Sequence, residues 1–168
     1  MPFVGRGRRV RGAQPMNTLV RFALDDGAAA RIGDLRARAA AAGCGVPRDR
    51  PALTAASAVA VPAAARAALD AELRVLALPS VWLGTLGAAA GRPNELVLAA
   101  VVDTELLAVH AAVHDALAGR VRGPVAAYLP GAWLPHCVLA RDAPAAAFAA
   151  LHPVEPVRAR IVGVEVGP

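Results

Sequence analysis

Alternating apolar and polar residues recur along the chain and predict short β-strands. The segment 17–24 is the clearest case, because Val20 and Phe22 fall on one side and Arg21 on the other. Residues two apart share a face of a strand, so this segment is expected to bury one face. Similar runs rich in β-branched and apolar residues predict further strands over 51–59, 80–87, 95–102, 132–141 and 157–166.

Helical spacing of apolar residues fills most of the intervals between these strands. It predicts helices over about 27–42, 62–76, 103–119 and 144–151. Asp25 and Asp103 stand where N-caps are needed, and Pro62 opens the second helix. The segment 120–131 contains Gly and Pro and is expected to be a loop.

The order of these elements is strand, helix, strand, helix, strand, and then the same order again. The chain therefore predicts an α+β fold of two pseudo-symmetric lobes of antiparallel strands, with helices on the outside and a groove between the sheets. No Gly-rich phosphate loop of the Walker or dinucleotide-binding type is present, because "GRGRRVRG" is not followed by a helix.

Composition adds a distinction between the first 15 residues and the rest. The chain has 168 residues, of which 57% are hydrophobic, and its net charge is +5. Four of its arginines lie in residues 1–15, which contain no acidic residue, so residues 16–168 carry a net charge of only +1. Residues 1–15 are expected to be either a disordered basic tail able to meet RNA phosphates or a mis-assigned start before Met16. Residues 16–168 are expected to form a single domain.

Cysteine content and hydropathy bear on the cellular compartment. Cys44 and Cys137 are too few for a disulfide framework or a zinc cluster, and two free thiols suit a reducing cytosol. No apolar run reaches the length of a membrane span, and the N-terminus lacks the apolar region of a secretory signal. A cytoplasmic protein without membrane association is therefore expected.

Two short phrases, one in each half, carry the candidate chemistry. "RPALTAA" (50–56) and "LPHCVLA" (134–140) each contain Pro, a key residue, an apolar residue and a second key residue. By strand parity, Ala52 and Thr54 share a face in the first phrase, and His136 and Val138 share a face in the second. The lone histidine thus has a counterpart position in the other half.

These phrases make the chain resemble the 2H phosphoesterase superfamily, and within it the bacterial 2′-5′ RNA ligase, or RNA 2′,3′-cyclic phosphodiesterase, family. That family carries two His-x-Thr/Ser motifs, often as a Pro-His-x-Thr-Leu phrase. The resemblance covers most of residues 17–166, and "YLPGAWLPHCVLAR" (128–141) is its most specific part. Both motifs depart from the family pattern, because Ala52 replaces the first histidine and Val138 replaces the second hydroxyl residue.

The resemblance implies a phosphate site that uses no metal and no cofactor. His136 would be the remaining general acid or base and Thr54 the remaining phosphate-binding hydroxyl. The ligands implied are RNA ends or small nucleotides with a phosphate, bound by a monomer. Since a second imidazole and a second hydroxyl are missing, catalysis is expected to be weakened or lost. A non-catalytic nucleotide- or RNA-binding module and an interaction domain with a vestigial groove remain the alternatives.

Several other side chains are candidates around this site. Arg21 lies on the non-core side of its strand and would clamp a phosphate. Arg141 follows the second phrase as in the family pattern, but strand parity points it away from His136, toward solvent. Tyr128 and Trp133 would stack a base at the groove mouth, although core packing is the expected role of Trp133.

The remaining histidines have weaker claims to function. His110 and His114 are four residues apart on a predicted helix, a spacing that can hold zinc. No third ligand is evident, so a surface or half-buried pair is expected instead. His152 follows the last predicted helix and is expected to face solvent.

Overall fold

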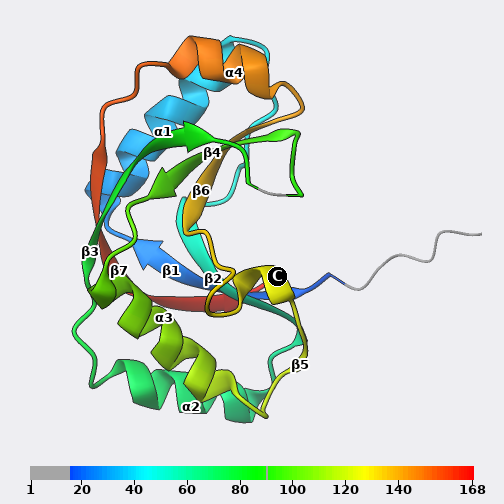
Figure 1. Cartoon of the computed structure of the whole chain (residues 1–168), viewed down its shortest axis with the longest axis vertical. Coiled ribbons are helices and arrows are strands. Elements are labelled where there is room, and N and C mark those ends of the chain that lie inside the picture. The colour runs from blue at the N-terminus through cyan, green and yellow to red at the C-terminus, as the bar shows by residue number, and fades with distance from the viewer. Residues whose placement is uncertain (1–15, 90) are drawn as a thin grey trace, which may run out of the picture.

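The computed structural model describes residues 16–89 and 91–168 and shows the predicted α+β architecture (Figure 1). The prediction for residues 1–15 lies outside the described residues. The strands are β1 (Thr18–Leu24), β2 (Ala52–Ala60), β3 (Ser80–Gly87), β4 (Glu95–Ala100), β5 (Arg122–Pro124), β6 (His136–Arg141) and β7 (Val157–Gly167). The helices are α1 (Asp26–Ala41), α2 (Ala63–Leu73), α3 (Thr104–Leu117) and α4 (Pro144–Leu151), with a 3-10 turn at Ala126–Tyr128.

The long strand β7 joins the two lobes into one sheet. The strand order is β5-β2-β1-β7-β3-β4-β6, and all neighbours are antiparallel. Residues 157–160 of β7 pair with β3, and residues 161–167 pair with β1. The two-lobed arrangement is confirmed, but the lobes are not the two halves of the sequence, because β3 from the first half joins β4 and β6 from the second.

The helices exchange between lobes in the same way. α1 contacts α4 and β6, whereas α2 contacts α3, and α3 contacts β2. Figure 1 shows α1 and α4 on the outside of the lobe of β4 and β6, and α2 and α3 on the outside of the lobe of β1 and β2. The helices therefore cover the sheet from outside, as predicted, and leave the facing surfaces of β2 and β6 available for a site.

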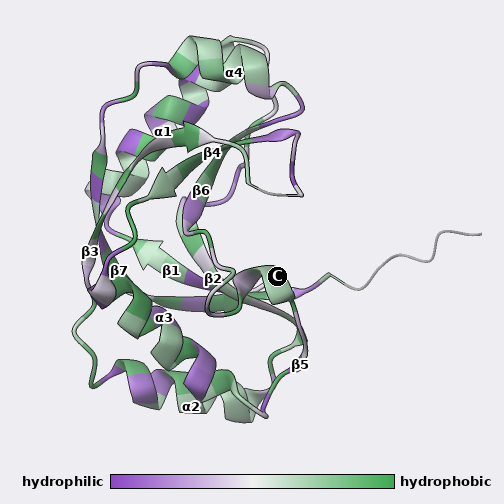
Figure 2. Cartoon of the chain, in the orientation of Figure 1, coloured by the Kyte–Doolittle hydropathy of each residue, from purple (hydrophilic) through white to green (hydrophobic). Residues whose placement is uncertain are grey.

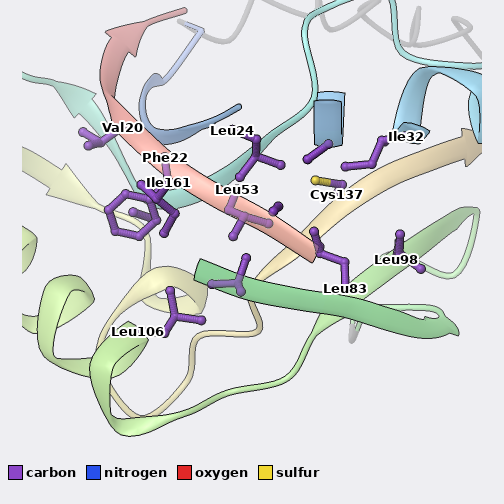
Figure 3. Packing of buried hydrophobic residues seen from close by; sticks show 14 of the residues in the cluster. Val20, Phe22, Leu24, Ile32, Leu53, Leu83, Leu98, Leu106, Cys137 and Ile161 are labelled. Carbon is purple, nitrogen blue, oxygen red and sulfur yellow. The ribbon is translucent and has the colours of Figure 1, made fainter. Parts of the chain in front are cut away.

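The core consists of the apolar side chains that the strands and helices turn toward each other. Phe22, Leu53, Leu83 and Leu98 are fully buried, and each such side chain contributes about 1.5–3 kcal/mol by leaving water. Figure 3 shows them gathered between the strands, with the sulfur of Cys137 among them. Hydrophilic positions on α1 and α2 alternate with hydrophobic ones along the ribbon, as expected for helices that cover a core (Figure 2).

The predicted helix caps are present. The side chain of Asp25 accepts a hydrogen bond from the N–H of Ala28 at 3.1 Å, and Asp103 accepts one from Leu106 at 2.8 Å. Gly43 has a φ of 83° just beyond α1, a conformation that favours glycine. The caps fix the start of α1 and α3 where the sequence places them.

The prediction of a loop over 120–131 is wrong in part. Residues 122–124 form the short edge strand β5, which pairs with Ala58 and Ala60 of β2. The N–H of Val125 extends this pairing to the carbonyl of Ser57 at 2.8 Å. The strand escapes sequence-based prediction because it is only three residues long, with Gly123 at a φ of 58° in its centre.

Each strand that carries one of the two phrases contains a β-bulge at the same place. In β2, Ala55 is the extra residue, because consecutive residues of β1 pair with Thr54 and Ala56. In β6, Leu139 is the extra residue in the same way. Each bulge follows the first key position of its phrase by three residues, so the pseudo-symmetry of the lobes extends to this irregularity. A bulge shifts the alternation of faces along its strand.

Candidate phosphate-binding cavity

A cavity of about 620 Å³ lies where β2 of one lobe approaches β6 of the other. This volume falls in the range of small-molecule sites. Five residues singled out from the sequence border it, namely Arg21, Thr54, Tyr128, His136 and Arg141. Ala52 and Val138, the positions at which the sequence departs from the motifs of the family it resembles, border the same cavity. Residues of both phrases thus border one cavity.

Hydrogen bonds from Trp133 and Cys137 to the first phrase link the two lobes at the cavity. The thiol of Cys137 donates to the carbonyl of Ala52 across a sulfur–oxygen distance of 3.3 Å, and the indole N–H of Trp133 donates to the carbonyl of Thr54 at 2.8 Å. Cys137 is buried, and burial raises its thiol pKa to about 12, so it serves as a neutral donor. These two bonds fix residues 52 and 54 relative to β6.

The bulges bring one more residue of each strand to the cavity. Beyond Ala55, the cavity-facing position of β2 becomes Ser57, and beyond Leu139 the cavity-facing position of β6 becomes Arg141. The prediction that Arg141 points away from His136 is therefore wrong, since it assumed strict alternation along β6. The bulge places Leu139 and Ala140 in the core side by side and returns Arg141 to the face of His136.

His136 is arranged as a base and not as an acid. Its Nδ1 lies 2.7 Å from the carbonyl oxygen of Leu134, which can only accept, so Nδ1 carries the proton and Nε2 the lone pair. Burial lowers the pKa of His136 below 6.5, and the charge of Arg92 acts in the same direction, while the bond to Leu134 and Glu95 oppose it. The imidazole is thus neutral near pH 7. No side-chain nitrogen or oxygen buried in the described residues lacks a partner, so the free Nε2 reaches solvent.

Three arginines at the cavity are held by acidic partners. Arg21 forms an ion pair with Asp49 at 3.7 Å and a hydrogen bond to the carbonyl of Pro168. Glu95 lies 3.4 Å from Arg92 and 3.5 Å from Arg141. Arg92 also donates to the hydroxyl of Tyr128 at 2.7 Å, which leaves the proton of that hydroxyl free to point at a ligand.

Arg36 of α1 is a fourth arginine at the cavity, and it is nearly buried. Only 7% of its surface is exposed. Its Nε donates to the carbonyl of Val138 at 3.0 Å, and its Nη1 donates to the carbonyl of Asp49 at 2.6 Å. Burial lowers the pKa of Arg36, with the charge of Asp49 opposing it, but a guanidinium remains charged in proteins. The side chain therefore brings a fixed positive charge between the two phrases.

The histidine pair on α3 supports the bulge of β2. His110 Nε2 lies 3.0 Å from the carbonyls of Ala55 and Tyr128, and His114 Nε2 lies 3.1 Å from the carbonyl of Ala55. The ring of His110 also stacks on Trp133 with centroids 3.8 Å apart. The expectation of a surface or half-buried pair is wrong for His110, of which only 1% is exposed. Within residues 16–89 and 91–168, no group of three metal-ligating side chains is present.

The two remaining predictions on single residues are confirmed. Trp133 packs against the core, as expected, with its ring also edge-on to Phe22 at a centroid distance of 6.1 Å. His152 is exposed after α4.

In the part of the chain that the structure describes, no helix is long and apolar enough to cross a membrane.

Sequence reasoning missed five polar residues at the cavity, and one of them had a visible signal. The five are Asn17, Arg36, Asp49, Ser57 and Arg92. Arg36 interrupts the apolar stripe of its helix, which a solvated arginine would not do. Ser57 depends on a bulge, and Asp49 and Arg92 lie outside the helices and strands, where periodicity gives no direction.

Comparison with known proteins adds evidence on the fold. No protein-family model matches the chain, and no curated protein sequence matches it. Among solved structures, the chain is similar to the crystal structure of the MHV ns2 PDE domain, with a TM-score of 0.65 and 15% sequence identity. The alignment covers 90% of this chain and 97% of that chain. The two-lobed architecture and this likeness together show that the chain has a 2H phosphoesterase-like fold.

Proposed function

We propose that the cavity binds the phosphate of an RNA end or a small nucleotide, and that it descends from a 2′,3′-cyclic phosphodiesterase site whose hydrolysis is now slow or lost. The observation that carries the proposal is the shared cavity. His136 and Thr54, one from each lobe, border it together with several arginines. Arginine forks match phosphate oxygens in geometry and charge. Binding of phosphate is therefore supported by residues that are all present.

The weakness of catalysis follows from what stands at the two altered positions. Opening a cyclic phosphate requires a base for the attacking water and an acid for the leaving oxygen. His136 is held as a neutral base, but the methyl group of Ala52 has no proton to give. Loss of one acid–base partner costs about 10²–10⁴ in rate. The methyl groups of Val138 also remove a hydrogen bond to a charged oxygen, worth about 1.5–3 kcal/mol.

A non-catalytic binding module is the second candidate, and the same cavity supports it. The described structure argues against a vestigial groove, because Ala52 and Val138 border open space and are not covered by apolar side chains. The fold neighbour is called a PDE domain, which fits a phosphodiesterase origin for either candidate. As part of this proposal, the protein acts as a monomer in the cytoplasm, where two free cysteines remain reduced.

The experiment that separates these candidates restores the lost groups. The double variant Ala52→His, Val138→Thr should hydrolyse 2′,3′-cyclic AMP at least about 100-fold faster than the wild type, because it regains the acid and the hydroxyl. Product formation is followed by chromatography of 2′-AMP and 3′-AMP. The matched control is the same double variant carrying His136→Ala, which should lose the gain.

Two outcomes would decide against the proposal. If the double variant folds, as judged by circular dichroism, but gains no hydrolysis, the phosphodiesterase origin of the site is wrong. If neither 2′-AMP nor 3′-AMP binds the wild-type protein at millimolar concentration in calorimetry, phosphate binding itself is wrong. Wild-type hydrolysis at the rate of the double variant would show that catalysis was never impaired.

A further inference from the structure

Arg36 differs from the other arginines of the cavity in having no acidic partner. Arg21 forms an ion pair with Asp49, and Glu95 forms ion pairs with Arg92 and Arg141. No ion pair to Arg36 exists among residues 16–89 and 91–168. The charge of Asp49 favours the charged form of Arg36 without forming an ion pair, and a buried charge that has no direct ion pair is costly unless something else compensates it. Two main-chain carbonyls satisfy part of the guanidinium, and its Nη2 has no protein partner in the described structure.

The free end of Arg36 opens into the cavity. No buried side-chain nitrogen or oxygen in the described residues lacks a partner, so Nη2 must reach solvent. The side chain borders the cavity described above and is otherwise 93% covered, since only 7% of it is exposed. A polar group held this rigidly, with unused donors at a cavity wall, is built to meet a ligand.

The anchors of Arg36 place it beside the altered motif positions. Its Nε is bonded to the carbonyl of Val138 in β6, and its Nη1 to the carbonyl of Asp49, three residues before Ala52. The small side chain of Ala52 leaves room in this corner that an imidazole would otherwise occupy. The corner has therefore lost a group that transfers a proton, while it retains a cation that binds anions.

The positive charge around the cavity favours the more highly charged of two anions. Four arginines border it, and the carboxylates that pair with them are Asp49 and Glu95. His136 is neutral near pH 7, so the side chains at the cavity carry a net positive charge, reduced at Arg21 by the oxygen of Pro168 to which it donates. A 2′,3′-cyclic phosphate carries one negative charge, whereas a terminal phosphate monoester carries nearly two at pH 7.

We infer that the ligand is a terminal phosphate monoester and not a cyclic diester, and that Arg36 binds its oxygens in the space left by Ala52. The inference rests on the proposed phosphate site and names its ligand class. Arg36 determines specificity in this account, because its free N–H donors stabilise the second negative charge of the monoester. The cavity then binds the kind of molecule that hydrolysis of a cyclic phosphate produces.

Calorimetry on the full chain at pH 7.5 tests the inference with ligands that differ only at the phosphate. The wild type should bind 3′-AMP at least about tenfold more tightly than 2′,3′-cyclic AMP, and adenosine more weakly than either. Arg36→Met should weaken 3′-AMP binding by about 10- to 100-fold and 2′,3′-cyclic AMP binding by less. The ratio of the two affinities should therefore fall toward one. An RNA oligonucleotide ending in a 3′-phosphate, compared with 3′-AMP, shows whether RNA ends or free nucleotides are the source.

Matched variants keep the test decisive. Arg74→Met removes an exposed arginine after α2, away from the cavity, and should change no affinity. If Arg36→Met does not fold, Arg36→Lys keeps the charge without the fork and should lower the preference for the monoester. The inference is wrong if the wild type binds 3′-AMP and 2′,3′-cyclic AMP with equal affinity. It is also wrong if a folded Arg36 variant keeps the wild-type ratio of these affinities. Either result leaves the proposed phosphate site in place. Absence of binding by every phosphate ligand overturns the site itself.

Discussion

Acid should destabilise this fold by protonating His110, which is buried with no acidic partner among the described residues. Only 1% of its surface is exposed, and its pKa is lowered from 6.5 to about 4 by burial and by the neighbouring His114, against the opposing bonds to the carbonyls of Ala55 and Tyr128. In the unfolded chain the imidazole binds a proton below about pH 6.5, whereas in the folded chain it does so only below about 4. The unfolded state therefore binds more protons in this window, and the free energy of unfolding falls as the pH falls.

The magnitude follows from the difference between the two pKa values. Each unit of difference is worth about 1.36 kcal/mol, so lowering the pH from 7 to 4.5 should remove about 2–3 kcal/mol from the free energy of unfolding. Urea denaturation at pH 7, 5.5 and 4.5, followed by tryptophan fluorescence, measures this change. Asp25 also has a lowered pKa, because main-chain hydrogen bonds favour its charged form, but its contribution is lost below about pH 3.8.

The variant His110→Gln provides the control for this prediction. Glutamine keeps an N–H donor for the carbonyl of Ala55 but does not titrate, so the loss of stability between pH 7 and 4.5 should be smaller by about 2 kcal/mol or more. The comparison also removes the contribution of His136, whose lowered pKa acts in the same direction. If the wild type and the variant show the same dependence on pH, His110 is not buried as a neutral ring beneath the bulge.

Three further predictions concern the cavity wall and the fold. The thiol of Cys137, with its pKa raised to about 12 by burial, should resist iodoacetamide at pH 8 until urea unfolds the protein; mass spectrometry detecting rapid native labelling would contradict this. Leu139→Ala should lower the free energy of unfolding by about 2–5 kcal/mol in urea, because Leu139 is fully buried in the core, whereas Val75→Ala on the surface should cost under about 0.5 kcal/mol. Asp103→Ala should cost about 1 kcal/mol by removing the cap of α3, and Asp70→Ala, exposed on α2, should leave the melting temperature unaltered.

The spacing of apolar residues was sufficient to predict most strands and helices, because each spacing pattern extends over only a few neighbouring residues. The predicted strand 80–87 and helix 144–151 coincide with β3 and α4. Aspartates and glycine marked the helix ends, because a cap needs a particular side chain at one position. Assignment of strands and helices to lobes needed long-range pairing, and the sequence does not encode in any local pattern that β3 pairs with β7 or that α1 covers β6.

About half of the polar residues at the cavity could also be predicted from the sequence. Comparison of the two phrases located Thr54 and His136 at one cavity, because equal positions in similar lobes face the same groove. Strict parity failed at Arg141, since one extra residue in β6 reverses every side chain after it. The small side chains around Ala55 and the apolar run around Leu139 carry no mark of a bulge.

Arg36 could have been recognised from the sequence as a candidate site residue, because it is a charged residue among apolar ones. It lies at a core-facing position of a predicted amphipathic helix, and a charge at such a position has to be compensated by something in the fold. The sequence cannot name the compensating groups, because they are main-chain carbonyls of residues 49 and 138 that folding alone brings together. Arg92 lies in a loop and carried no such signal.

The most direct test of the phosphate site is a nuclear magnetic resonance titration of the labelled protein with 3′-AMP. The account predicts that the largest shifts fall on the amides of residues 52–57 and 136–141 and on the imidazole nitrogens of His136, and that they saturate with one ligand bound. Adenosine alone should move these signals far less. Shifts that are absent at millimolar 3′-AMP, or that gather around His114 and Leu117 at the apolar cavity beneath α3, would contradict the account.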